Sequence, residues 1–121
     1  MRIGYARDSL SAPILHTQID KLKAAGCQKI FTSIKSVEKS NVINTIKDFI
    51  RVGEDTIVVC SFICLDKPLK ELIDFFHQLN KLQLSFESIK DNLIIDKNKW
   101  AIAFSGIHLY QQLKNVKDED D

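Results

Sequence analysis

Two short runs of apolar residues place the strongest constraint on the fold of this 121-residue chain. The first run is Ile3–Ala6 and the second is Ile57–Cys60. Neither run alternates with polar residues, which is typical of strands that are buried on both faces. Such strands belong to parallel sheets covered by helices on both sides. We therefore predict an α/β protein in which these two strands lie side by side at the centre of the sheet.

Segments with helical spacing of apolar residues separate the expected strands. We expect strands at residues 3–6, 28–32, 55–62 and 84–89, a short edge strand at 92–95, and helices at 13–25, 41–51, 67–80 and 100–116, with a loop at 33–40. This alternation predicts a mainly parallel sheet of four to five strands with helices on both faces. Residues 1–116 should form one domain, and the acidic residues 117–121 should form a disordered tail.

Composition narrows the class of protein further. Hydrophobic residues make up 45% of the chain and charged residues 27%, as in ordinary globular domains. The formal net charge of +1 argues against strong DNA binding by this chain alone. Three cysteines without a framework spacing, and a first segment that reads as a strand rather than a leader, predict a cytoplasmic protein with reduced thiols. The spacing of Cys60 and Cys64 fits no zinc pattern, so we expect neither a metal nor a cofactor.

A candidate site follows the first strand directly. Arg7, Asp8 and Ser9 come where the strand gives way to a polar loop, and the carboxyl edge of an open sheet is where such proteins collect functional groups. An arginine can bind a phosphate oxygen while a nearby serine hydroxyl attacks the phosphorus. The alternative is structural, because serines in such loops commonly cap or line the turn.

The segment Arg2–Ser9, which reads RIGYARDS, resembles the opening of the serine site-specific recombinases, the resolvase and invertase family. In that family a strand ends in Ala-Arg-Val-Ser and the serine attacks DNA. The similarity continues at Gln18–Leu22, at Gly26-Cys27 and at Asp55–Val59. The resemblance implies a resolvase-like catalytic domain with a C-terminal dimerisation helix. It also implies that Ser9 forms a phosphoserine link to a DNA end, with Arg7 and Lys67 at the phosphate.

The chain departs from the family after the third strand, where the family has Leu-Asp-Arg-Leu-Gly-Arg. Aligned on Asp55–Val59, Ile63 replaces the aspartate, Cys64 replaces the first arginine and Lys67 replaces the second. Another family arginine has no counterpart in the stretch 36–41. Lysine lacks the planar fork of arginine, and one transition-state arginine can be worth about 10³ to 10⁵ in rate. We therefore expect a catalytically impaired site.

Two functions remain open at this point. The first is a serine-recombinase domain in DNA recombination, which binds DNA weakly alone or through a further region and forms a homodimer. The second is a non-enzymatic dimerisation or protein-interaction module derived from that fold. In either case the apolar surplus on Trp100–Val116 predicts self-association through Phe104, Ile107 and their neighbours. A receiver-like domain is disfavoured, because it needs clustered acids after the first strand and Asp8 is alone there.

Overall fold

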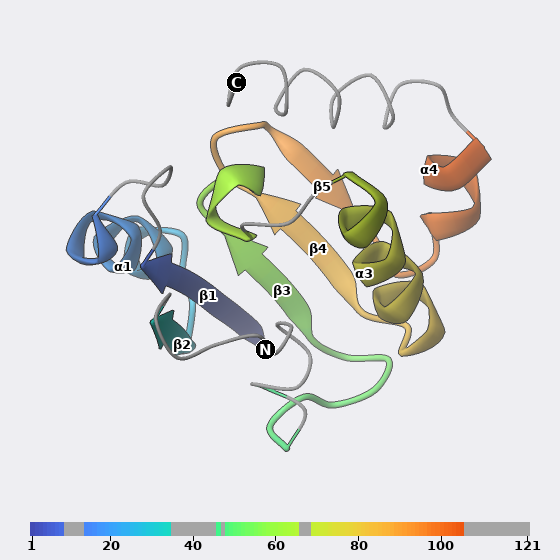
Figure 1. Cartoon of the computed structure of the whole chain (residues 1–121). Helices are drawn as coiled ribbons and strands as arrows, with labels where there is room; N and C mark the ends of the chain where they lie inside the picture. The colour runs from blue at the N-terminus through green and yellow to red at the C-terminus, as the bar shows by residue number, and fades with distance from the viewer. Residues whose placement is uncertain (9–13, 35–45, 47, 66–68, 106–121) are drawn as a thin grey trace.

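A computed structural model describes residues 1–8, 14–34, 46, 48–65 and 69–105 of the chain, and one sheet runs through them (Figure 1). The strands are β1 (Arg2–Asp8), β2 (Lys29–Ile34), β3 (Thr56–Val59), β4 (Ser85–Ser88) and β5 (Leu93–Ile95). Their order in this five-stranded sheet is β2-β1-β3-β4-β5. The first four pair in parallel, and β5 runs antiparallel to β4. The predicted α/β class, the mainly parallel sheet and the adjacent inner positions of β1 and β3 are confirmed.

Helices cover the two faces of this sheet, as Figure 1 shows for α1 (Leu15–Ala24) and α3 (Leu69–Lys81). Side chains alternate along a strand, so β1 sends Ile3 and Tyr5 into the core on the α3 side, while Ala6 joins Leu22 of α1 on the other side. The larger core contains an aromatic cluster on the α3 side, made by Phe62, Phe75, Phe76, Phe86 and Trp100.

Three strand ends differ from the sequence-based expectation by two residues or more, each because of contacts elsewhere in the chain. The first strand was expected to end at Ala6, but β1 continues to Asp8, which pairs with Ile34 of β2. The second strand was expected to end at Thr32, but β2 continues to Ile34 because β1 supplies a partner as far as the Asp8–Ile34 pair. The third strand was expected to reach Phe62, but β3 ends at Val59. The 3-10 helix η1 (Phe62–Leu65) follows it, and the Phe62 N–H donates to the Asp91 carboxylate rather than to a neighbouring strand.

The C-terminal part of the described chain packs onto the α3 side through α4 (Trp100–Ser105). The Trp100 indole N–H donates to the Leu84 carbonyl at 2.8 Å, and the Phe104 ring stacks on His77 with centroids 4.1 Å apart. Ile102, by contrast, is 64% exposed. Three expected segments lie wholly or mostly outside the described residues: the helix at 41–51, the second part of the helix at 100–116, and the tail at 117–121. Of the first of these, residues 48–51 are described and are not helical.

Within the part of the chain that the structure describes, none of the helices combines the length and the apolar character needed to cross a membrane.

Candidate active site at the carboxyl edge of the sheet

Arg7 lies near the carboxyl end of β1 and is only 9% exposed. Its Nη1 atom donates to the Tyr5 hydroxyl at 3.3 Å, and both side chains project from the same face of β1. A guanidinium held by a neighbouring phenol has little rotamer freedom left. This strand end therefore holds a buried, positioned guanidinium, and the role of Arg7 at a phosphate stays a prediction.

Gln18 of α1 fixes the backbone of this strand end. The Arg7 N–H donates to Gln18 Oε1 at 3.0 Å, and Gln18 Nε2 donates to the Arg7 carbonyl at 2.8 Å. Both Arg7 groups face the side of β1 where β3 lies, but the pairing with β3 ends at Tyr5–Val59. The fully buried amide thus hydrogen-bonds to both backbone groups of Arg7 at the point where the pairing of β1 with β3 stops.

Gln18 also contacts the end of β3. The Cys60 thiol donates to the Gln18 backbone carbonyl at 3.4 Å. In the sequence, Gln18 enters only as part of a family resemblance, yet a physical signal is present. It shares a helical stripe with Leu15 and Leu22, and a polar side chain on a buried helix face must find hydrogen-bond partners.

The segment after β3 turns sharply inward. The Cys64 N–H donates to the Ser61 carbonyl at 3.1 Å, and the Ser61 hydroxyl lies 3.6 Å from the Cys64 sulfur. Cys64 is fully buried. The neighbouring Cys60 lowers the pKa of Cys64 despite its burial, and Ser61 lowers it further, while the same pairing of the two cysteines raises the pKa of Cys60.

Asp91 anchors the start of η1. Its Oδ2 atom accepts from the Phe62 N–H at 3.0 Å and from the Ser88 hydroxyl at 2.6 Å. One carboxylate therefore joins the segment after β3 to the end of β4. Sequence reasoning did not single out Asp91; the polar pair Asp91-Asn92 between two strands signals a turn, but not this long-range contact.

The structure describes only part of the predicted site. Arg7 lies at the expected edge. Ser9 and Lys67 fall outside the described residues, as does the stretch 36–41, so their grouping with Arg7 stays a prediction. Ile63 and Cys64 both belong to η1 after β3, which is the segment aligned with the family's aspartate and first arginine. At the second of these positions the chain has a buried thiol instead of an exposed cation.

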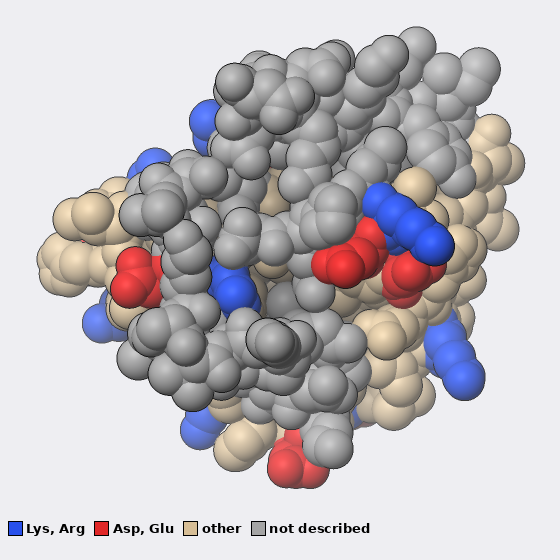
Figure 2. All heavy atoms as spheres, in the orientation of Figure 1, with Lys and Arg blue, Asp and Glu red and all other residues tan. Residues whose placement is uncertain are grey.

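Charges on the described surface are mixed. Figure 2 shows Lys and Arg side chains interspersed with Asp and Glu on the face in view, in keeping with the formal net charge of +1. Among the residues that the structure describes, no group of three or more His, Cys, Asp or Glu side chains could hold a metal ion.

Comparison with known proteins places nearly the whole chain, including the carboxyl edge of the sheet described above, in one protein family. The family model described as "Resolvase, N terminal domain" matches residues 2–114. The Tn552 DNA-invertase BinR of Staphylococcus aureus is 38% identical over 100 residues, which cover 81% of this chain and 52% of that protein. The Tn552 resolvase of the same organism is 39% identical over 100 residues, covering 81% of this chain and 50% of that protein.

A probable DNA-invertase, y4cG of Sinorhizobium fredii, is 33% identical over 92 residues, which cover 74% of this chain and 30% of that protein. The chain thus spans about half the length of the Tn552 relatives. The family match covers almost all of the described structure, including Arg7, Gln18 and η1. The chain therefore belongs to the resolvase family and is a serine-recombinase N-terminal domain.

Proposed function

We propose that this domain serves DNA recombination with an impaired cleavage site, in which Ser9 is the inherited nucleophile and Arg7 and Lys67 are the remaining cations at the phosphate. The observation that carries the proposal is the state of Cys64. This thiol is fully buried and lies 3.6 Å from the Ser61 hydroxyl, at the position aligned with a family arginine. A buried thiol brings no positive charge to a phosphate.

Loss of charge matters because phosphoryl transfer depends on stabilising the negative charge that develops in the transition state. Arg7 is held in place by Tyr5 and by the backbone clasp of Gln18. It is one positioned cation where the family pattern has several arginines. Lys67 would supply a point charge without the two parallel hydrogen bonds of a guanidinium. We therefore expect the replacement of arginine by lysine to weaken phosphate binding less than it slows phosphoryl transfer, because the charge remains but the paired hydrogen bonds to the transition state are lost.

The partners follow from the same family pattern. The chain spans about half of its Tn552 relatives, and its net charge of +1 gives little electrostatic attraction to a duplex. We propose that it engages DNA through a further region or a partner and associates as a homodimer through the helix that starts at Trp100. The three free thiols fit a reducing cytoplasm.

The test is covalent capture of DNA. The chain, fused to a DNA-binding domain that delivers it to a crossover site, is incubated with a nicked suicide substrate and resolved on denaturing gels. We expect no protein–DNA adduct, whereas the matching segment of the Tn552 resolvase in the same fusion serves as the reference. A Ser9-dependent adduct from the unmodified chain, lost in Ser9→Ala, would overturn the impairment.

A variant that returns the family's residues to this segment tests whether their loss causes the impairment. Ile63→Asp, Cys64→Arg and Lys67→Arg together should recover a trace of adduct, limited by the arginine that is missing before the second helix. Circular dichroism confirms that the variant folds, since arginine at a buried position is costly. Full activity in this triple variant would show that the other missing arginine is dispensable.

The second candidate function is a non-enzymatic interaction module, which is favoured by the exposure of Ile102 on α4. Such a module should bind its partner or itself equally well with Ser9→Ala and Arg7→Ala. A recombinase assembly on DNA should instead weaken when Arg7 no longer contacts phosphate. Gel-shift titration of both variants against the wild type separates the two functions.

A further inference from the structure

A pocket of about 430 Å³ opens on the α1 side of the sheet, and the proposed chemistry does not use it. Its described lining consists of two lysines, two alanines, an isoleucine and a cysteine: Lys21, Ala24, Ala25, Cys60, Ile89 and Lys90. Arg7, the cation of the candidate active site, is not among them. Pockets of this size suit a small organic molecule, and they usually combine an apolar wall with a few polar groups.

Regular structure holds the walls of this pocket in place. The lining residues at the end of α1 lie three and four positions apart, so they share one face of the helix. The Cys60 thiol donates to the Gln18 carbonyl at 3.4 Å, which joins the end of β3 to that helix. The Lys90 N–H donates to the Cys60 carbonyl at 2.8 Å, which joins the turn after β4 to the same strand end. Contacts within the chain therefore form the pocket without a ligand.

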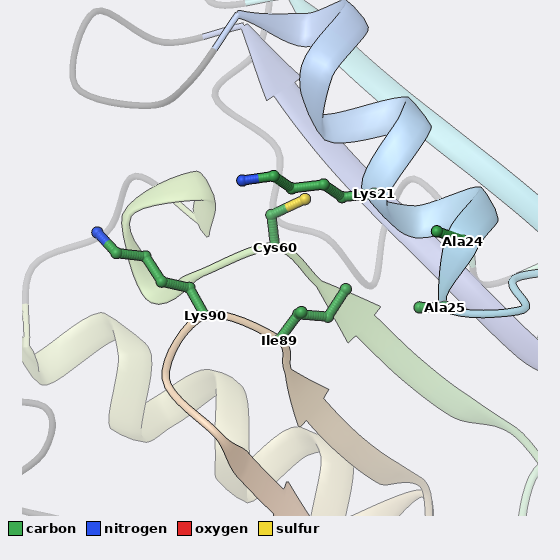
Figure 3. Close-up of a pocket in the computed structure, with 6 residues that line it drawn as sticks. All are labelled: Lys21, Ala24, Ala25, Cys60, Ile89 and Lys90. Atoms are coloured by element: carbon green, nitrogen blue, oxygen red, sulfur yellow. The ribbon is translucent and has the colours of Figure 1, made fainter.

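The pocket is apolar at one end and positively charged at the other. Figure 3 shows the two alanines of α1 toward one end, whereas the ammonium groups of Lys21 and Lys90 lie toward the other. Ile89 adds to the apolar part, since it is half-buried and packs against the core cluster that contains Cys60. This arrangement suits a molecule with an apolar body and one negatively charged end.

The two ammonium groups are not neutralised within the described part of the chain. Neither Lys21 nor Lys90 takes part in an ion pair with a described residue, and no carboxylate is among the described lining residues. Two acids close to Lys90 in sequence are engaged elsewhere. Glu87 pairs with Arg2 at 2.9 Å, and the Asp91 carboxylate accepts the two hydrogen bonds that anchor η1. An anionic group in the pocket thus meets two cations and no repelling carboxylate in the described lining.

We propose that this pocket binds a small amphipathic carboxylate of the medium-chain fatty acid type, with its carboxylate between Lys21 and Lys90 and its apolar body along the alanines of α1 and Ile89. Two lysines act as point charges, so they attract a carboxylate without requiring the planar, paired contact of an arginine. The apolar wall favours a chain of methylene groups, because each one that leaves water adds to the affinity. This inference is independent of the proposed recombination function, because it involves neither Ser9 nor Arg7.

The experiment titrates the full chain with octanoate and follows binding by calorimetry and by the amide shifts in heteronuclear NMR spectra. We expect a dissociation constant of about 0.1 to 1 mM for a ligand of this size. The largest shifts should fall on the amides of Ala24, Ala25 and Lys90. Shifts centred on Ile94 or Ile102, the exposed isoleucines of β5 and α4, would overturn the proposal, because octanoate would then only coat exposed apolar side chains.

A series of probes separates the role of the charge from that of the apolar body. Hexanoate, which is two methylene groups shorter, should bind about tenfold more weakly than octanoate. Acetate should show no saturation over the same concentrations. Octanol should bind more weakly than octanoate, and octylammonium more weakly still, because its charge is repelled by the two lysines. Octanol or acetate that binds as tightly as octanoate would overturn the proposal.

Substitutions at the charged end test the two lysines. Lys21→Gln and Lys90→Gln should each weaken octanoate binding about two- to fivefold, as expected for solvent-exposed charges, and leave octanol binding unchanged. Lys23→Gln is the matched control, since Lys23 is exposed on α1 but does not line the pocket. Equal effects of Lys21→Gln and Lys23→Gln would contradict the site, because octanoate would then respond to the charge of the helix as a whole.

A substitution at the apolar end blocks the pocket. Ala24 is exposed on α1, so Ala24→Trp should place a large side chain in the pocket without disturbing the core and should abolish octanoate binding. Lys23→Trp, outside the pocket, should bind octanoate like the wild type. Urea unfolding verifies that each variant is folded. Full affinity in a folded Ala24→Trp variant would overturn the proposal, and the lysine variants decide the question if Ala24→Trp does not fold.

Discussion

The side-chain amide of Gln18 is hydrogen-bonded to both backbone groups of Arg7, as acceptor to its N–H at 3.0 Å and as donor to its carbonyl at 2.8 Å. This relationship makes α1 part of the candidate site, because the helix holds the strand end that carries the arginine. The stability of the domain and the geometry of the site therefore depend on the same side chain.

Gln18→Ala should lower the free energy of unfolding by about 2 to 4 kcal/mol, since it removes both hydrogen bonds between the buried Gln18 amide and the Arg7 backbone. Urea unfolding followed by circular dichroism measures the change. His16→Ala is the control, because His16 lies on the same helix with an exposed side chain and should change stability by less than about 0.5 kcal/mol. Equal effects of the two substitutions would contradict the role given to Gln18.

The stability of the domain should also depend on Asp91, whose carboxylate joins the segment after β3 to the end of β4. Asp91→Ala removes the acceptor shared by the Phe62 N–H and the Ser88 hydroxyl and should cost about 2 to 3 kcal/mol, because hydrogen bonds to a charged acceptor are the stronger kind. Hydrogen exchange at the Phe62 amide should accelerate as well. Asp74→Ala, at an exposed position on α3, should leave both measurements unchanged. Unchanged exchange at Phe62 in Asp91→Ala would show that η1 does not depend on this carboxylate.

The central strands could be predicted from sequence because their own residues are continuously apolar, which indicates burial on both faces. A run such as Ile57–Val59 has no polar side to turn toward water, so only an inner strand can hold it. The end of β3 could not be predicted in this way. It depends on Asp91, which lies 29 residues after Phe62 in the chain, and no local pattern carries that contact.

The same difference applies to the site. The position of Arg7 at the carboxyl edge follows from strand polarity, which a local sequence pattern reveals. The burial of Cys60 and Cys64 in one cluster could not be foreseen, because it requires the turn closed by the Cys64 N–H and the Ser61 carbonyl. Spacing alone left the two cysteines as unrelated core residues. A four-residue separation brings side chains together in a helix, but not at the end of a strand.

Gly4 sets a steric limit on the α1 side of β1. A Cβ at this position would lie 3.1 Å from Leu22 Cδ1, 3.2 Å from Cys27 Sγ and 3.3 Å from Ile30 Cγ1. Gly4→Ala should therefore lower the free energy of unfolding by about 1 to 3 kcal/mol through overpacking. Adding Cys27→Ala should recover part of that loss, because it removes one of the three contacts. If the double variant is no more stable than Gly4→Ala in urea unfolding, crowding against Cys27 is not the cause.

Self-association should depend on the exposed side of α4. Trp100 is buried, and the Phe104 ring stacks on Trp100 and His77 within the chain. Among the described residues of α4, Ile102 is therefore the large apolar side chain that a second copy could cover. A large aliphatic side chain that is 64% exposed gains apolar burial when a second copy covers it. Ile102→Asp should weaken a dimer about tenfold or more, because it removes this burial and places a carboxylate in the contact. Sedimentation equilibrium at micromolar concentrations measures the dissociation constant.

The matched control is Ile94→Asp, since Ile94 is a comparably exposed isoleucine on the edge strand β5. Dissociation by Ile94→Asp with an intact dimer in Ile102→Asp would move the interface from α4 to the β5 edge, and a wild type that stays monomeric would remove it altogether.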